Sequence, residues 1–380
     1  MNDRNVTVLT GNGLSIGFNE ELKLDKITRR AIQAIRSGGN DKVHEAMKKI
    51  AERVFQVPTG SPDEDFEQLV GAFGEELRNL RLYMELADSF SPGDQNVSSA
   101  ISVVEDFARD VRDSGISHVL EDISKKSYAA QDKRDALNSL LTAIESSFDG
   151  QIDFANLNYD TLLLAALTDL FDAYLSDMGD GREMRMMALR DGGAEKKCLG
   201  LRTEPELMPG RRIGLVHLHG SLVYWRDVHT GQSFKIPVEA TRESAQWNAV
   251  RNKTTPLRPT IVLSSARDKA HEILQHPYSV AYEYTENSLR KSKHWMIIGY
   301  SFRDEPVNEI LAKCFESHGE SKPQVMVVGS KTSPTLEAIL AGLRWNVEDD
   351  RFVNWLTIDR EGVAGVEKRS SWDTFSARAD

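Results

Sequence analysis

Short apolar runs alternate along this chain with longer segments in which apolar residues follow helical spacing. The run 6–10 ends in two closely spaced glycines, which is typical of a buried strand that turns into a helix. Further runs predict strands at 152–156, 213–218, 260–263, 294–298 and 324–328, the last three of the buried parallel type. Helices are expected at 161–175, 278–289, 306–315 and 336–343. This alternation predicts an α/β fold with a doubly wound, Rossmann-like parallel sheet.

The segment from 24 to 148 follows helical spacing throughout. One helical face is formed by Val43, Ala46, Met47, Ile50, Ala51 and Val54. Ser61-Pro62-Asp63-Glu64 predicts a capped helix start, and further helices are expected at 100–111 and 136–144. We therefore predict a helical insertion domain at 24–148, with residues 1–23 and 149–380 forming the sheet domain.

Two further stretches fall between the predicted strands and helices. The stretch 180–212 is polar, with scattered glycine and methionine, and is expected to be an irregular loop. Runs at 223–227 and 233–237 flank Thr230-Gly231 and predict a hairpin.

Composition and charge narrow the function classes. The chain has 380 residues and a net charge of −11, which argues against broad nucleic-acid binding. It lacks a signal-peptide pattern and any run approaching a membrane span, so we expect a cytoplasmic protein without membrane contact. Cys198 and Cys314 are the only cysteines, which excludes a disulfide framework and a four-cysteine zinc site.

Four polar motifs follow predicted strands, at the edge where open α/β sheets bind ligands. They are Gly11-Asn12-Gly13-Leu14-Ser15, Asn156-Leu157-Asn158-Tyr159-Asp160-Thr161, Val216-His217-Leu218-His219-Gly220-Ser221 and Ile297-Ile298-Gly299-Tyr300-Ser301-Phe302-Arg303-Asp304, the last followed by Asn308. The glycine turn lets backbone amides approach an anion such as a phosphate. Each motif also has a simpler explanation. Asn158 and Asp160 could cap a helix, His219 could be a core histidine, and the glycines could form ordinary turns.

Taken in this order, the motifs resemble the sirtuin-like family, specifically bacterial relatives of the sirtuin deacylases that hydrolyse NAD in antiphage defence. The matching elements are Gly11-Asn12-Gly13-Leu14-Ser15, Asn158-Tyr159-Asp160, His219-Gly220 and Gly299–Asp304 with Asn308. Asp65-Phe66-Glu67-Gln68-Leu69 also looks like an element of that family's helical insertion. Asn156 departs from the pattern, because the family often has threonine there. The resemblance covers residues 5 to 330.

The resemblance implies NAD as substrate and a set of site residues. Asn158 would orient a water or the carboxamide, His219 would accept a ribose hydroxyl proton, and Asp160 would orient the site. Asp304 and Asn308 would grip the adenosine ribose. The residues expected to bind NAD are Gly11, Asn12, Gly13, Ser15, Asn158, Asp160, Gly299, Ser301, Phe302, Asp304 and Asn308.

The cysteine count then decides between reactions. Sirtuin deacylases carry a four-cysteine zinc ribbon, which this chain cannot build, so we expect no zinc and water as acceptor. The reaction becomes NAD glycohydrolysis to ADP-ribose and nicotinamide, depleting NAD in abortive infection. The long run of amphipathic helices at 24–148 predicts a homo-oligomer, and the resemblance implies a partner, first a HerA-type ring ATPase and second a short Argonaute. A non-catalytic NAD- or ADP-ribose-binding regulatory subunit of a partner ATPase or nuclease is the alternative, and an ADP-ribosyltransferase or deacylase is a third.

Overall fold

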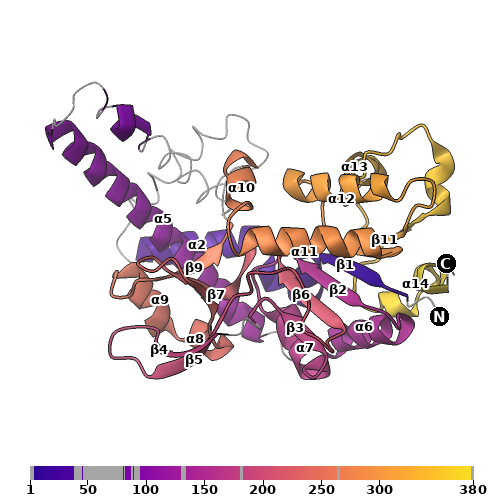
Figure 1. Ribbon diagram of the computed structural model, residues 1–380, viewed down its shortest axis with the longest axis horizontal. Coiled ribbons are helices and arrows are strands. Elements are labelled where there is room, and N and C mark those ends of the chain that lie inside the picture. Colours follow the sequence, from indigo (N-terminus) through magenta and orange to yellow (C-terminus); the bar gives the residue numbers. More distant parts are fainter. Residues whose placement is uncertain are drawn as a thin grey trace.

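The computed structural model describes residues 4–37, 45, 80, 82–86, 89, 95–129, 134–179, 183–262 and 266–377, and all structural statements refer to these residues. The pattern at 43–54, the helix start at 61–64 and the element at 65–69 lie outside them. Figure 1 shows a twisted sheet covered by helices on both faces. No described helix combines the length and the apolarity needed to cross a membrane.

The main sheet has seven strands in the order β12-β11-β10-β1-β2-β6-β3, and every neighbouring pair is parallel. The strands are β1 Val6–Thr10, β2 Ile152–Asn156, β3 Leu175–Asp177, β6 Ile213–His217, β10 His294–Ile298, β11 Gln324–Val328 and β12 Leu356–Asp359. Strands β1, β2, β6 and β10 are buried along their whole length, which explains their continuous apolar character. The predicted doubly wound α/β fold is therefore confirmed.

Helices follow the strands as the alternating pattern predicts. In Figure 1, α11 lies along one face of the sheet, and α6 and α7 lie on the opposite face. The helices are α1 Asn12–Phe18, α2 Leu24–Ser37, α5 Gln95–Ala129, α6 Arg134–Ser147, α7 Leu162–Phe171, α8 Val238–Arg242, α9 Ser244–Arg251, α10 Ala266–Glu272, α11 Tyr278–Lys291, α12 Glu305–Ser317, α13 Leu336–Gly342 and α14 Ser370–Ala377, with 3₁₀ turns η1 Glu20–Leu22, η4 Asp350–Asn354 and η5 Val366–Lys368. The helix expected at 161–175 ends at Phe171, because the chain turns there into β3.

A second sheet corrects two predictions. Its five strands run in the order β4-β5-β8-β7-β9, with antiparallel pairing throughout. They are β4 Met184–Ala188, β5 Glu195–Gly200, β7 Gly220–Asp227, β8 Ser233–Lys235 and β9 Leu257–Ile261. The loop expected at 180–212 is wrong where β4 and β5 form, because these largely exposed strands lack the continuous apolar run of a buried strand and depend on their pairing with each other. The run at 260–263 was expected to be a parallel strand, but β9 pairs antiparallel with β7. The β7–β8 hairpin is confirmed.

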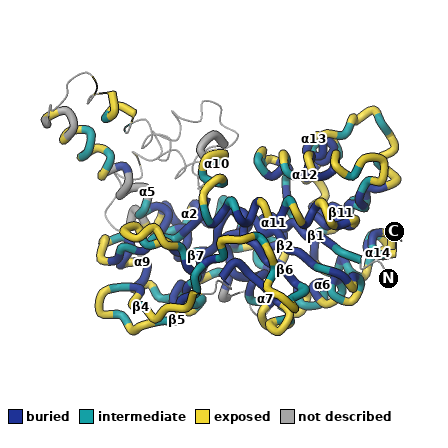
Figure 2. The backbone as a smooth tube through the Cα atoms, in the orientation of Figure 1, coloured by how far each residue is buried: buried dark blue, intermediate teal, exposed yellow. Residues whose placement is uncertain are grey.

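Two hydrophobic clusters hold these layers together, and Figure 2 shows the buried segments inside them. The first joins the parallel sheet to its covering helices, including α6 through Leu137, Leu141 and Ile144. The second joins α2 and α5 to the antiparallel sheet and α9, with Leu120, Trp225 and Trp247 fully buried. Strands from the expected sheet domain thus pack on helices from the expected insertion, and the domain boundaries stay a prediction.

Candidate functional site

Two loops cross in close contact at the carboxyl edge of the parallel sheet. The turn from β1 into α1 carries Gly11 and Gly13, and the loop after β10 carries Gly299, which has φ +63°. A Cβ on Gly13 would lie 2.5 Å from the Cα of Gly299, and a Cβ on Gly299 would lie 2.4 Å from the Cα of Gly13. Only glycine fits at this crossing, because real side chains never approach backbone so closely.

The crossing changes the physical role expected of the glycine turn. The N–H of Gly11 donates to the carbonyl of Ile298 at 2.8 Å, and the N–H of Gly13 donates to the carbonyl of Gly299 at 2.9 Å. These two amides are engaged within the fold, and the anion-binding role expected of the turn stays a prediction for its other amides. The glycines allow the two strand-end loops to form one wall of a cavity.

A cavity of about 890 Å³ opens at this edge, within the range of small-molecule sites. Its polar side comprises Asn12, Asn158, Asp160, His219, Ser301 and Asp304. Its apolar side comes from the helical region and includes Leu22, Leu24, Ile27 and Ile123. The cavity therefore lies between the sheet edge and helices α2 and α5.

Asn158 is held by a chain of directed hydrogen bonds. Its Nδ2 donates to the carbonyl of Gly11 at 3.0 Å and to Oγ of Ser15 at 2.9 Å. Ser15 in turn donates to Oδ2 of Asp160 at 2.5 Å, and Oδ1 of Asp160 accepts the Leu162 N–H at 3.0 Å. Both amide hydrogens of Asn158 are used, so its Oδ1 remains as an acceptor. Asp160 thus caps α7, whereas Asn158 does not.

Asn156 fixes the backbone of Asn158 from behind. Its Oδ1 accepts the Asn158 N–H at 3.1 Å, and its Nδ2 contacts the Asn158 carbonyl at 3.3 Å. The same Nδ2 lies 3.2 Å from Nδ1 of His217, and Oδ1 also accepts from Thr10 at 2.8 Å. Because Nδ2 donates, Nδ1 of His217 must accept, which requires a neutral ring. Burial lowers the pKa of His217 to about 4, consistent with that state.

His219 and Asp304 meet on the opposite side of the polar wall. Nε2 of His219 lies 3.2 Å from Oδ2 of Asp304, and both side chains are over nine-tenths buried. The same Oδ2 pairs with the ammonium of Lys269, from α10. Burial and then the Lys269 charge lower the pKa of His219. Burial favours protonated Asp304, but His219 and Lys269 outweigh it and lower the pKa of this carboxyl.

The net pKa shift of Asp160 is opposite to that of Asp304, because no cation offsets its burial. Burial raises the pKa of this carboxyl, against the lowering effect of the Ser15 hydroxyl and the Leu162 amide. The two carboxyls of the site are therefore pushed in opposite directions by their surroundings. Such contrasts are typical of functional sites.

The loop between β10 and α12 is tied by its own side chains. Tyr300 donates to Oδ1 of Asn308 at 2.9 Å, and Nδ2 of Asn308 donates to the carbonyl of Phe302 at 2.9 Å. Oδ1 of Asp304 accepts the Val307 N–H at 3.2 Å and caps α12. Phe302 has φ +59° and is buried. Asn308 therefore braces this loop.

Most of the expected site residues line one cavity. The lining includes Gly11, Asn12, Gly13, Asn158, Asp160, His219, Gly299, Ser301 and Asp304. Ser15, Phe302 and Asn308 lie outside the lining and support it through the contacts above. Their roles toward a ligand stay predictions.

Two parts of the lining were missed from the sequence. Gly329 and Ser330 follow β11 and line the cavity, and the strand-end rule that selected the other motifs could have found them. Lys269 lies in a short polar helix with no motif around it, so no sequence signal singles it out.

Neither cysteine lies in the cavity lining. Both are buried, and burial raises the pKa of each thiol to about 11. Among the described residues no group of three or more metal-binding side chains gathers. The expected absence of zinc stays a prediction.

The strand order of the parallel sheet reverses between β1 and β10, because the chain extends from β1 toward β2 and β6 on one side and from β10 toward β11 and β12 on the other. Open α/β sheets of this type bind nucleotides in the crevice at such a point. A family model described as SIR2-like domain matches residues 153–347, just over half of the chain. The chain therefore belongs to the SIR2-like family, and this membership implies an NAD-related activity. The match contains Asn158, His219 and Gly299, whereas the glycine turn after β1 lies before it. No curated protein matches the chain.

Proposed function

We propose that this protein is an NAD glycohydrolase, which cleaves NAD with water into ADP-ribose, nicotinamide and a proton. The observation that carries the proposal is the pairing of Asn158 and His219 on one polar wall. They follow the neighbouring strands β2 and β6, are 7% and 6% exposed, and line the same cavity. A buried acceptor and a buried neutral base in one cavity suit attack by water on an activated sugar.

Asn158 supplies a fixed acceptor. Because Gly11 and Ser15 take both hydrogens of its Nδ2, its Oδ1 is free to accept from a donor in the cavity. A water that donates to this oxygen is oriented with its lone pair outward, as a nucleophile requires. The backbone clamp from Asn156 keeps this oxygen in place.

His219 supplies the base. Its lowered pKa keeps the imidazole neutral near pH 7, so it can accept a proton from a ribose hydroxyl. A ribose oxygen with increased electron density stabilises positive charge that develops at the neighbouring anomeric carbon. Asp304 lies beside this ring, and both of its oxygens already have partners. We therefore assign Asp304 to the His219 side of the site, in place of the ribose grip expected from the sequence.

The rest of the cavity suits an extended dinucleotide. The side chains of Leu22, Leu24 and Ile27 form an apolar wall that excludes water from a flat aromatic ring. The strand-end loops at 299–301 and 329–330 lie along the crevice, where such sheets bind nucleotides. With two cysteines in the chain, we assign no zinc to the reaction and expect that chelators leave it unchanged.

The biological role extends this proposal. Complete NAD cleavage depletes the cell, which suits abortive infection in antiphage defence. Such an activity needs control, so we propose a homo-oligomer that works with a HerA-type ring ATPase or a short Argonaute. The chain has no phosphate-binding loop of the ATPase type, so an ATPase would be a separate polypeptide.

A second function uses the same cavity without turnover. In this alternative the protein binds NAD or ADP-ribose and regulates a partner ATPase or nuclease. The crossing glycines and the apolar wall suit binding alone. The Asn158 and His219 pair favours the enzyme, because a site that only binds has no need of a buried base.

The test is nicotinamide release from NAD, measured by chromatography for the wild type and for His219→Ala, each with and without a ring ATPase or short Argonaute partner. We expect release by the wild type and about a 100-fold slower rate for His219→Ala, with NAD affinity changed much less. Calorimetry supplies the affinities. Tight NAD binding with no nicotinamide under any of these conditions supports the regulatory subunit instead.

A further inference from the structure

Lys269 reaches the polar wall from α10, far in sequence from every other member of the site. Its ammonium pairs with Oδ2 of Asp304, and the side chains are 13% and 9% exposed. The same oxygen lies 3.2 Å from Nε2 of His219. One buried carboxylate oxygen therefore faces an ammonium and an imidazole together.

The geometry leaves His219 as the weaker partner of this oxygen. Oδ1 of Asp304 accepts the Val307 N–H, whereas both nitrogen groups meet at Oδ2. Lys269 makes the hydrogen bond, whereas Nε2 of His219 has no hydrogen-bond partner of acceptable geometry. The charge of Asp304 is thus neutralised by a permanent cation before it acts on the imidazole.

We propose that Lys269 is a positioning residue, which holds Asp304 and keeps His219 in the neutral form that a general base requires. The role of His219 as a base rests on the function proposed above. Its protonation state rests only on the geometry of Asp304 and Lys269. Without Lys269, the Asp304 carboxylate would be the nearest charge facing the ring and would stabilise the imidazolium. Lys269 thus prevents Asp304 from holding His219 in its protonated form.

Among the titratable and charged groups around this cluster, Lys269 and Asp304 decide the protonation state of His219. Burial raises the pKa of Tyr282 and of Tyr300, so both phenols stay neutral. Burial also raises the pKa of Asp160, which lies across the wall. The cavity rim adds one exposed residue of each sign, Arg303 and Glu305. Lys269 is the cation that lowers the pKa of His219, whereas the Asp304 carboxylate and a hydrogen bond to the Leu157 backbone raise it.

The experiment is a pH titration of the His219 ring by NMR in histidine-labelled protein, with the His219→Gln spectrum as assignment. Lys269→Met should raise the midpoint by about 1 pH unit or more, whereas Lys269→Arg should keep it within about 0.3. Asp304→Asn removes the opposing charge and should lower the midpoint. Asparagine still caps a helix, so α12 is retained. Lys125→Met is the control, because Lys125 pairs with Glu121 on α5.

The opposite signs separate the proposal from loss of fold. Partial unfolding moves a buried histidine toward its ordinary pKa in every variant, so it cannot lower the midpoint in Asp304→Asn. An unchanged midpoint in Lys269→Met overturns the proposal, and Lys269→Gln repeats the measurement if the methionine variant does not fold.

The pH dependence of NAD cleavage is measured in parallel. In Lys269→Met the acid limb of the rate profile should move upward with the NMR midpoint. If the wild type releases no nicotinamide, the proposed function fails, yet the NMR titration still decides the role of Lys269.

Discussion

The two sheets carry cavities of very different character. The cavity at the edge of the parallel sheet gathers buried polar side chains, such as Asn158 and His219, whose partners fix their orientation. The cavity beside the antiparallel sheet, of about 610 Å³, is lined largely by the loop 201–209 and by exposed ion pairs such as Arg185 with Glu183. Exposed pairs contribute little and move freely. Size alone therefore does not identify a reactive site.

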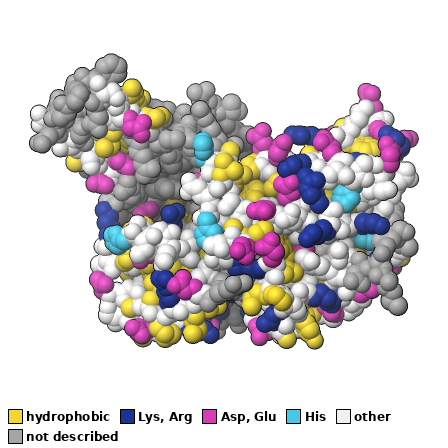
Figure 3. All heavy atoms as spheres, in the orientation of Figure 1, with side chains coloured by type: hydrophobic (Ala, Val, Ile, Leu, Met, Phe, Trp, Pro, Cys, Tyr) yellow, Lys and Arg dark blue, Asp and Glu magenta, His cyan; other side chains and the backbone are white. Residues whose placement is uncertain are grey.

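Topology explains why the buried polar groups of Asn158 and His219 line a crevice at the parallel sheet. In the parallel sheet, β1 lies between β10 and β2, so the loops that follow these strands leave in different directions and open a crevice. The antiparallel strands β7 and β8 are joined by a tight hairpin, which leaves no such crevice. The second sheet packs on α2 and α5 and so supports the apolar wall of the first cavity. The surfaces of both regions mix acidic and basic groups (Figure 3), so the contrast lies in the buried groups.

The largest expected effect tests whether chemistry belongs to the parallel sheet alone. Asn158→Ala should lower NAD cleavage at least 100-fold, because the oriented acceptor is lost. Arg185→Ala, at the other cavity, should leave the rate within about 2-fold. Nicotinamide release and thermal melting are measured on both. Full activity with a lowered melting point in Asn158→Ala would reduce this residue to a structural one.

The glycine crossing can be broken with a matched pair of variants. Gly299→Ala places a Cβ 2.4 Å from backbone and should cost about 3 kcal/mol of stability, with loss of activity. Gly192 has a similar φ of +67° but nothing within 4 Å, so Gly192→Ala should cost only about 1 kcal/mol. Urea unfolding measures both. Equal costs would show that backbone strain, rather than contact between the loops, requires glycine at 299.

Local sequence was sufficient to predict five of the seven strands of the parallel sheet, all but β3 and β12, and of the antiparallel sheet only the β7–β8 hairpin. Strands β1, β2 and β10 are buried on both faces, so their apolar runs are unambiguous. Strand β4 is an exposed edge whose pairing with β5 depends on tertiary context, so its short stretch of methionines did not predict a strand. The same limit applies to β9, which has an apolar run but pairs antiparallel.

The site shows the same division. Asn158, His219 and Asp304 could be predicted as site residues because each follows a predicted parallel strand, and the carboxyl ends of parallel strands meet at one edge of the sheet. The sequence pattern could not reveal that Asn308 braces its own loop, or that Lys269 arrives from a separate helix. Such contacts depend on where distant elements pack, which no local spacing encodes.

Acid sensitivity sharpens the comparison, because each region holds a histidine whose pKa burial lowers to about 4, His217 in the first and His118 on α5. The unfolded state, with an ordinary histidine pKa of 6.5, binds more protons than the folded state between about pH 6.5 and 4. The free energy of unfolding should therefore fall as pH drops through this window. His217→Asn keeps an acceptor for Asn156 and should reduce that fall by about 2 kcal/mol.

His118→Asn should have a smaller effect on the loss of unfolding free energy at low pH, because this ring is partly exposed. Urea unfolding at several pH values compares the three proteins. A slope that His217→Asn leaves unchanged would mean that this ring is charged in the folded protein. His217→Leu removes the acceptor for Asn156 and should also slow NAD cleavage. His217→Asn keeps an acceptor and should retain the cleavage rate.

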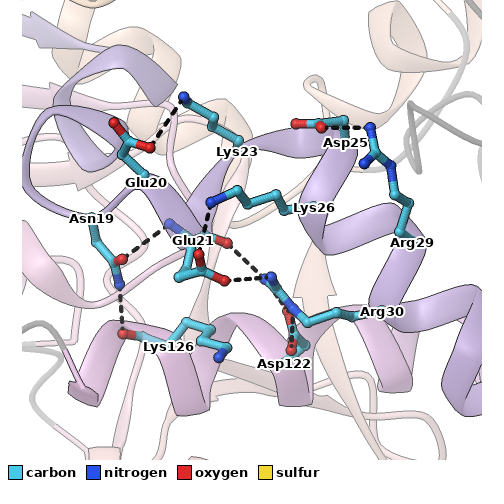
Figure 4. Close-up of polar contacts among 10 residues, drawn as sticks. All are labelled: Asn19, Glu20, Glu21, Lys23, Asp25, Lys26, Arg29, Arg30, Asp122 and Lys126. Carbon is cyan, nitrogen blue, oxygen red and sulfur yellow. Dashed lines mark hydrogen bonds and ion pairs between the residues drawn. The ribbon is translucent and has the colours of Figure 1, made fainter.

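The smallest expected effect concerns the helical wall of the cavity. Arg30 of α2 joins two elements there, with Nη1 2.9 Å from Oε2 of Glu21 and Nε 2.9 Å from both oxygens of Asp122 on α5 (Figure 4). Its neighbour Arg29 pairs only with Asp25 of the same helix and is far more exposed, 65% against 26%. The two arginines therefore differ in what they connect.

Arg30→Met should cost about 1 kcal/mol and raise the KM for NAD a few-fold, because Ile27 and Ile123 of the apolar wall lie on the helices that Arg30 joins. Arg29→Met should change stability by less than about 0.5 kcal/mol and leave the KM unchanged, since exposed pairs within one helix contribute little. Urea unfolding and initial rates over a range of NAD concentrations measure both variants. If Arg30→Met loses stability with no change in KM, the wall does not depend on this ion pair, and the helical region supports the fold without shaping the substrate site.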